Sequence, residues 1–414
     1  MTLARKPDEE PQVDVHGGVV TTAGGGWRDV LARLRHGDLS VLPVALTLAV
    51  IWIVFYSQDS IFLSPRNLSF LFLQIAVIGT IALGVTFVLL IGEIDLSVAV
   101  TSGVCAAVTG VLVTRQGWDP IPAILLALAI GAAIGLFQGY FVAVVGVPSF
   151  VVTLAGLLGL QGVMLLILGR GGSVNVNEDL IRDLTTTYLS EAVGWGLAVV
   201  IAGGYALSQV RRRTKRRAAG LSAPSMRGLA IRLGLVVVLL AAVVNVLNDY
   251  RGVPLASALL VALVAFFGYV TRRMKFGRYL YAIGGNAEAA RRAGIDVARV
   301  RIAAFTLSSL LCALAGVIGA SRFASVSYTA FAGGPLLLEA IAAAVIGGAT
   351  IFGGRGSPWG ALLGALVMGS LSNGLDLMQA STGTKLAISG GILLVAVTAD
   401  ALSQRGRGDI GVKG

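Results

Sequence analysis

Residues 70–114 read FLFLQIAVIGTIALGVTFVLLIGEIDLSVAVTSGVCAAVTGVLVT, and the only charged side chains among them are Glu93 and Asp95. About 20 apolar residues, each rising 1.5 Å along a helix, cross the hydrocarbon core of a bilayer. The two apolar runs on either side of the carboxylates are each about that long. The stretch therefore predicts two transmembrane helices joined by the short segment Gly92–Ser97.

The rest of the chain has the same character. Of its 414 residues 56% are hydrophobic and 13% are charged, and the mean hydropathy is +0.85. Soluble proteins carry roughly 25% charged residues, so this composition excludes a soluble enzyme. The predicted fold is an all-α, polytopic transmembrane helical bundle of about 12 spans, within limits of 10 to 14.

Twelve apolar runs are candidate spans. They are 41–56, 70–92, 96–114, 121–145, 147–169, 192–209, 228–247, 254–271, 302–320, 336–352, 358–378 and 384–398. The runs 81–97 and 341–357 share five residues at an offset of 260, which leaves a duplicated half and a chance match equally open. Duplicated halves and broken helices are common in transporters.

The positive charges predict the orientation of these spans. If the N-terminus is cytoplasmic, 25 of the 32 Lys and Arg residues lie inside and 7 lie outside. Because cytoplasmic connections are enriched in Lys and Arg, we expect both termini inside. The same asymmetry accounts for the net charge of +11 without a nucleic-acid partner.

The chain then divides by location. Residues 1–40 form a cytoplasmic polar tail, residues 41–400 the transmembrane domain, and residues 401–414 a second cytoplasmic tail. Within the domain, 211–227 is a basic cytoplasmic connection and 272–301 a long cytoplasmic loop. The first span acts as an uncleaved anchor. The outer connection Arg170–Glu191 is also too long for a turn, and we expect a short helix in it and in the loop 272–301.

Sequence motifs of an enzyme are missing. The chain has no phosphate-binding loop and no metallohydrolase or serine-hydrolase signature, and both histidines, His16 and His36, lie in the polar tail. Cys105 and Cys312 lie far apart inside apolar runs, which predicts neither a disulfide nor a metal site. We expect no catalytic residue, no metal and no cofactor in this chain.

The segment Gly92–Ser97 has the pattern of a helix break. Gly92 ends one helix, and the side chain of Asp95 or Ser97 caps the next by accepting from its free N–H groups. Carboxylates between two apolar runs are costly unless they face water or a protein cavity. Glu93, Asp95 and Ser97 therefore either line a substrate path or form a cytoplasmic turn.

Two further patterns concern helix packing and a short cytoplasmic helix. Gly131, Gly135 and Gly139 give one span a flat face for close contact with another helix, in the same chain or in a second copy.

In the loop 272–301, helix signals bracket residues 287–293. Asn286 is a good N-cap, Glu288 suits the first turn, Arg291 and Arg292 suit the last turn, and Gly294 suits the position after it. A helix this short needs a partner to be stable; the alternative is a solvated charged loop.

Three segments together resemble a known family. GEIDLS at 92–97, GGNAEAARRAG at 284–294 and IAAAVIGGATIFGGRGS at 341–357 resemble permeases of ribose-, galactose- and xylose-type ATP-binding-cassette importers. The resemblance covers roughly residues 65–400. VPSFVVTLAG at 147–156, LNDYRGVP at 247–254 and the extra basic segment with two added spans are similar to the xylose-type subgroup.

This resemblance implies the function and the partners. It implies a bacterial inner-membrane permease subunit for D-xylose or a related pentose or hexose, a second permease copy, and an extracytoplasmic sugar-binding protein. It also implies a separate ATPase subunit that binds ATP and Mg²⁺. Residues 284–294 become the coupling helix that docks on the ATPase, with Asn286, Glu288, Ala290, Arg291, Arg292 and Gly294 as its docking residues. We expect Ala290→Trp to uncouple transport.

The same resemblance favours a sugar path near Gly92–Ser97 and Ile341–Gly348. A sugar offers many hydroxyls and no charge, so its path needs scattered hydrogen-bonding groups. Glu93, Asp95, Ser97, Glu339, Asn373 and Asp376 are the candidates, although Glu339 also suits a helix N-terminus. The competing hypotheses are a secondary sugar transporter driven by an ion gradient, with Glu339 and Asp376 as the ion site, and a membrane-embedded enzyme.

Overall fold

The computed structural model describes residues 41–221, 225–332 and 334–408. The compact unit that begins at Val44 contains every described helix from α3 onward. The predicted polar tail 1–40 and the last six residues of the predicted tail 401–414 lie outside the described residues.

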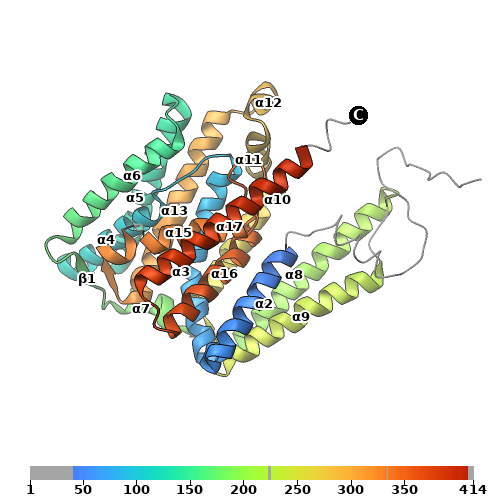
Figure 1. Ribbon diagram of the computed structural model, residues 1–414, viewed down its shortest axis with the longest axis horizontal. Coiled ribbons are helices and arrows are strands. Elements are labelled where there is room, and N and C mark those ends of the chain that lie inside the picture. Colours follow the sequence, from blue (N-terminus) through green and yellow to red (C-terminus); the bar gives the residue numbers. More distant parts are fainter. Residues whose placement is uncertain (1–40, 222–224, 333, 409–414) are drawn as a thin grey trace, which may run out of the picture. The chain divides into compact units, whose positions relative to one another are not determined.

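The described chain is a helical bundle, so the all-α prediction is confirmed (Figure 1). Each of the twelve predicted spans falls on a helix. These are α2 (Val41–Gln58), α3 (Pro65–Leu90), α4 (Val98–Gln116), α5 (Pro120–Tyr140), α6 (Ser149–Leu168), α8 (Glu191–Ala218), α9 (Met226–Asn248), α10 (Leu255–Arg273), α13 (Val297–Phe323), α15 (Gly334–Ile346), α16 (Pro358–Leu377) and α17 (Thr382–Gly408).

Ten of the described helical segments are long and apolar enough to cross a membrane, two of them as composites of α5 with the π-helix η2 (Phe141–Val145) and of α14 (Tyr328–Phe331) with α15. The apolar parts of α2 and α17 are shorter, at Val44–Gln58 and Thr382–Val395. The count lies within the predicted limits. The π-helix widens one turn within a span, a feature often found at functional sites.

The connections hold short elements. They are η1 (Ser60–Leu63), α7 (Asp179–Thr186), α11 (Lys275–Gly285), α12 (Ala287–Arg292), and the strands β1 (Ser173–Asn175), β2 (Tyr188–Leu189), β3 (Val253–Pro254) and β4 (Ser325–Ser327). Strand β1 pairs antiparallel with β4, and β2 pairs antiparallel with β3. Both predicted helices in long connections are thus present, as α7 and α12.

Helices α3 and α13 form the centre of the bundle. Nearly every residue of α3 from Asn67 onward is buried, and α13 packs against α3, α4 and α5. By contrast α6, α8 and α9 leave most of their apolar side chains exposed, as at Leu166 with 84% and Val200 with 69% of its surface accessible. Exposed apolar helices of this length require lipid or another protein around them. This arrangement fits a membrane-embedded protein.

The glycine face of α5 makes its close contact within the chain. A Cβ atom on Gly135 would lie 2.4 Å from the carbonyl oxygen of Phe305, and one on Gly131 would lie 2.5 Å from the Cβ of Ala313. A Cβ on Gly139 would lie 2.9 Å from Ile302 Cα. All three neighbours belong to α13, so the intrachain interpretation is confirmed.

One predicted helix boundary was wrong, and one helix was not predicted. The span predicted at 336–352 ends as a helix at Ile346, because Gly348 takes a left-handed φ of +91° and the chain turns there. Helix α11 was not predicted at all. Its glycines are poor helix formers, but Gly277 is required by packing, since a Cβ there would lie 2.3 Å from Thr271 Cα.

Candidate functional site

The segment Gly92–Ser97 is a helix break, as predicted. Gly92 has a φ of +75° and ends α3. The Oδ1 atom of Asp95 accepts from the backbone N–H of Ser97 at 2.8 Å and from its hydroxyl at 2.7 Å. Asp95 therefore organises the start of α4, whereas the Ser97 side chain makes no capping hydrogen bond to the helix.

This segment is tied to α5 and α6 by buried polar groups. Gln138 of α5 donates from Nε2 to the Ser97 hydroxyl at 2.8 Å. The N–H of Ile94 donates to Ser149 Oγ at 3.2 Å, and Thr153 Oγ1 donates to the carbonyl of Ile94 at 3.3 Å. The chain Gln138–Ser97–Asp95 thus connects the helix break to the face that α5 turns toward α6.

Two atoms of the Gln138–Ser97–Asp95 hydrogen-bond chain lack partners. Asp95 Oδ2 and Gln138 Oε1 are buried and make no hydrogen bond in the described structure. Burial raises the pKa of the Asp95 carboxyl, against the opposing effect of the hydrogen bonds from Ser97. Keeping a buried carboxylate charged without a counter-ion is unfavourable. The neutral acid is thus favoured more in the folded chain than in the unfolded one.

This environment leads to a prediction about Asp95. Asp95→Asn keeps the accepting oxygen and removes the buried charge, so the thermal midpoint should stay within a few degrees of wild type. Asp95→Ala also removes both hydrogen bonds to Ser97 and should cost about 1 kcal/mol of stability. As pH falls toward the carboxyl range, wild type should gain stability relative to Asp95→Asn, because protonation removes the buried charge. Thermal unfolding in detergent at several pH values measures this, and equal losses for both variants would contradict it.

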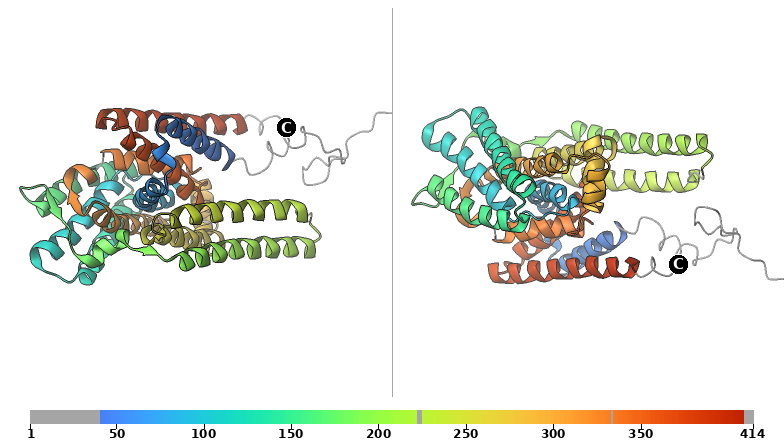
Figure 2. Two further views of the ribbon diagram at one scale, coloured as in Figure 1. Left: turned by 90° about the horizontal axis from the view of Figure 1, so that it is seen from below. Right: turned by 90° about the horizontal axis from the view of Figure 1, so that it is seen from above.

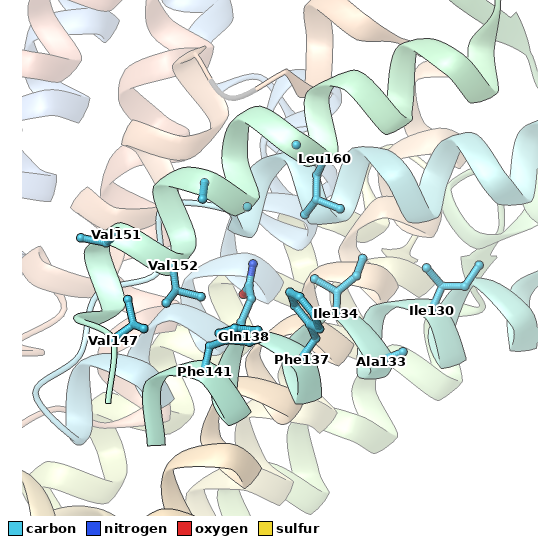
Figure 3. Close-up of a pocket in the computed structure, with 13 residues that line it drawn as sticks. Ile130, Ala133, Ile134, Phe137, Gln138, Phe141, Val147, Val151, Val152 and Leu160 are labelled. Atoms are coloured by element: carbon cyan, nitrogen blue, oxygen red, sulfur yellow. The ribbon is translucent and has the colours of Figure 1, made fainter. Parts of the chain in front are cut away.

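A groove between α5 and α6 opens beside the Gln138–Ser97–Asp95 hydrogen-bond chain (Figure 3). It has a volume of about 690 Å³, and Gln138 is its one polar side chain among the lining residues. Phe137 and Phe141 stand on the same wall, with ring centroids 4.8 Å apart. Sequence reasoning missed Gln138, whose one signal was a lone amide within the apolar span 121–145.

The other three predicted path residues lie at the opposite end of α3. Asn373 and Asn67 exchange hydrogen bonds of 2.7 and 3.1 Å between their side chains. Glu339 accepts from the Ser372 hydroxyl, and Asp376 pairs with Lys385. Asn67 and Leu90 stand roughly 35 Å apart at 1.5 Å per helical residue. The six predicted residues therefore form two groups at opposite ends of the bundle.

The three motif segments meet at one place, which we name the glycine junction (Gly92, Gly284, Gly353 and Gly354). Gly354 N–H donates to the Leu90 carbonyl at 3.0 Å. A Cβ atom on Gly284 would lie 1.9 Å from that same carbonyl oxygen and 2.3 Å from Gly354 N. Three backbone segments thus touch directly, which side chains would prevent.

Two side chains brace the glycine junction. Tyr281 of α11 donates its hydroxyl to the Gly356 carbonyl at 2.9 Å. Glu93 pairs with Arg301 of α13 at 3.2 Å, with both side chains largely buried. Glu93 thus has a partner inside the bundle, and the helix break is joined to α11, to α13 and to the loop before α16.

Helix α12 follows the junction directly, and its predicted ends are confirmed. Asn286 Oδ1 accepts from Ala289 N–H at 2.9 Å, and Gly294 has a φ of +84°. Glu288 pairs with Arg291 at 3.1 Å and with Arg292 at 3.3 Å, all three exposed.

The prediction that Ala290 is a docking residue was wrong. Ala290 is 4% exposed and belongs to the core of this chain, while its neighbour Ala289 is exposed. Helix α12 packs one side on α13, and that contact decides which alanine faces inward. The surface that α12 offers to a partner therefore carries Ala289, Glu288, Arg291 and Arg292.

The connection Arg170–Glu191 forms a folded platform on the end of α13. Ile181 is fully buried, and Thr185 forms a hydrogen bond with Ser321 at 2.7 Å. Glu178, Asp179 and Asp183 remain exposed on or beside α7. The platform and α12 lie at opposite ends of α13 (Figure 1). Helices α8 and α9 lie side by side, as the green pair in Figure 2 shows.

Comparison with known proteins decides the family. Residues 67–397 match the family described as "Branched-chain amino acid transport system / permease component". The chain belongs to this permease family. No solved structure matches the permease.

The permease has relatives among sugar transport proteins. It is 37% identical to the xylose transport system permease protein XylH of Escherichia coli K12, over 93% of this chain and 96% of that protein. It is 35% identical to XylH of Haemophilus influenzae over 90% and 99% of the two chains. The ribose import permease protein RbsC of Bacillus subtilis is 32% identical over 88% and 94%. These matches confirm the resemblance drawn from the three motif segments.

Proposed function

We propose that this permease is the membrane subunit of an ATP-driven importer in the bacterial inner membrane, and that it carries D-xylose or a related pentose or hexose. Its similarity to xylose permeases over nearly the whole chain carries the proposal. An extracytoplasmic binding protein delivers the sugar, and a separate ATPase subunit hydrolyses ATP.

Helix α12 is the part of the chain best suited to receive the ATPase. It is capped at both ends, charged, exposed on one side and joined to the bundle through the glycine junction. A displacement of α12 on binding the ATPase is therefore transmitted through the glycine junction to the helix break at Gly92–Ser97, because backbone contacts deform little.

A second copy of the permease completes the path for the sugar. The groove between α5 and α6 supports this, because two apolar helices that leave most of their surface uncovered border a buried amide whose oxygen has no partner among the described residues. Gln138 offers a hydrogen bond to a hydroxyl, while Phe137 and Phe141 offer apolar faces to the sugar's C–H groups. Ser97 and Asp95 hold Gln138 in place through the hydrogen bonds from Gln138 to Ser97 and from Ser97 to Asp95. Glu339, Asn373 and Asp376 lie at the other end of the bundle, toward the platform.

The exposed carboxylates of the outer platform lead to a prediction about delivery of the sugar. Neutralising Glu178, Asp179 and Asp183 together to Gln and Asn should weaken the apparent affinity for loaded binding protein about tenfold at low salt, and less at high salt, since exposed charges are screened. Asp119→Asn with Asp249→Asn, two exposed acids of other outer connections, is the control. Unchanged affinity at every ionic strength would remove the platform from docking.

The proposal is tested against an ion-driven carrier by labelled-sugar uptake in cells that lack their own xylose transporters. Cells would express the permease with a candidate ATPase and binding protein from the same genome. Depleting ATP while an ion gradient is maintained should stop uptake, and an ionophore with ATP maintained should not. Uptake that follows the ion gradient would instead support a secondary transporter.

A further inference from the structure

A cluster of positive charges remains that neither coupling nor the sugar path uses. The end of α8 carries Arg211, Arg212, Arg213, Lys215, Arg216 and Arg217. Four of these residues line a cleft of about 1040 Å³ together with Arg272 and Arg273 from the end of α10. We call it the basic cleft; its remaining walls are Gly204, Ser208, Gln209, Ala265, Gly268, Tyr269 and Trp359.

Five of the six cationic residues that line the basic cleft form no ion pair with any other described residue. Within the part of the chain that the structure describes, Arg211, Arg212, Lys215, Arg272 and Arg273 form no ion pair, and none of the lining residues is acidic. Orientation of the chain in a membrane requires positive charges on this side, but it does not require them to converge from two helices on one cavity. Such convergence raises mutual repulsion, which a bound anion would relieve.

The other walls of the cleft indicate where that anion comes from. Gly204, Ala265 and Gly268 lie within the predicted spans 192–209 and 254–271, so the cleft continues from the charged helix ends into the apolar zone. Tyr269 is 61% exposed and Trp359 half-buried, and such aromatic side chains favour the level of lipid headgroups. The cavity thus has a cationic end and an apolar end.

We propose that the basic cleft holds an anionic phospholipid, with its phosphate among the Arg and Lys side chains and its acyl chains along α8 and α10. Trp359 lines the cleft against α10, since a Cβ on Gly268 would lie 2.8 Å from its Nε1. Its indole N–H makes no hydrogen bond to any other described residue and is a further donor for the phosphate. Since α10 leads directly into α11, the lipid would steady the segment that carries Gly284.

Native mass spectrometry of the full-length permease, purified in detergent and given phosphatidylglycerol, cardiolipin or phosphatidylethanolamine, tests the proposal. The variant Arg212→Gln, Lys215→Gln, Arg273→Gln removes three lining charges. The matched control Arg217→Gln, Arg227→Gln, Arg232→Gln removes three exposed charges of α8 and α9 that do not line the cleft.

Wild type and the control variant should bind phosphatidylglycerol and cardiolipin more tightly than phosphatidylethanolamine. The cleft variant should lose about fivefold in affinity per neutralised residue, and about 100-fold in all. Lys215→Gln alone should show the fivefold loss if the triple variant folds poorly. Equal losses in the two triple variants would overturn the proposal, as would displacement of the lipid by ATP or inorganic phosphate. Reduced ATPase co-purification with unchanged lipid binding would instead assign the cleft to an acidic protein segment and would also overturn it.

Discussion

Gly284→Ala should reduce sugar uptake at least tenfold, because the glycine junction has no room for a methyl group. The new Cβ would lie 1.9 Å from the Leu90 carbonyl oxygen and 2.3 Å from Gly354 N, both of them backbone atoms. Backbone cannot rotate away as a flexible side chain can, so α11 must separate from the helix break. We expect a loss of about 3 kcal/mol in stability and at least a tenfold loss of sugar uptake.

The neighbouring residue provides the matched control. Gly285 lies in the same helix with nothing within 4 Å of its Cβ position, so Gly285→Ala should leave stability equal or up to about 1 kcal/mol higher. Thermal unfolding and uptake would be measured for both variants at equal expression. Near-normal uptake by Gly284→Ala would show that the three segments do not act as one rigid junction.

Ala289→Trp should uncouple ATP hydrolysis from uptake. Ala289 is exposed on the side of α12 that faces away from the bundle, so an indole there would block a close partner without disturbing this chain's own core. We expect normal insertion and thermal stability, an uptake reduced at least tenfold, and weakened co-purification of the ATPase.

Two further tryptophans separate docking from damage. Ala218→Trp, exposed at the end of α8, should leave uptake unchanged. Ala290→Trp should lower the thermal midpoint by several degrees, because it overfills a site that is 4% exposed. If Ala289→Trp transported normally, or if it lost stability as Ala290→Trp should, α12 would not be the docking helix.

The fold could be predicted from the sequence because each span is an apolar run long enough to cross a bilayer. Twelve apolar runs correspond to twelve helices, and Gly92, Asn286 and Gly294 mark the boundaries at which the chain does turn. The failures occur where tertiary contacts decide. Gly277 lies inside α11 because Thr271 packs against it, a contact that composition does not reveal.

The candidate site could be predicted only in part for the same reason. The capping signals located α12, yet which of Ala289 and Ala290 faces outward depends on how a two-turn helix lies on α13. The sequence does not indicate a role for Gln138, because a single amide in an apolar span has no distinctive pattern. Its role follows from its hydrogen bond to Ser97, which in turn donates to Asp95. Similarly, the contact between 92–97 and 353–356 appears in the structure alone.

Uptake by reconstituted proteoliposomes is the most direct test of the account. The permease, the candidate ATPase and the candidate binding protein would be combined with ATP on the ATPase side and labelled D-xylose on the other. The account predicts accumulation that requires all three proteins and stops when the ATPase carries an inactivating substitution in its own phosphate-binding loop. Equal accumulation without ATP, or with the permease alone, would contradict it.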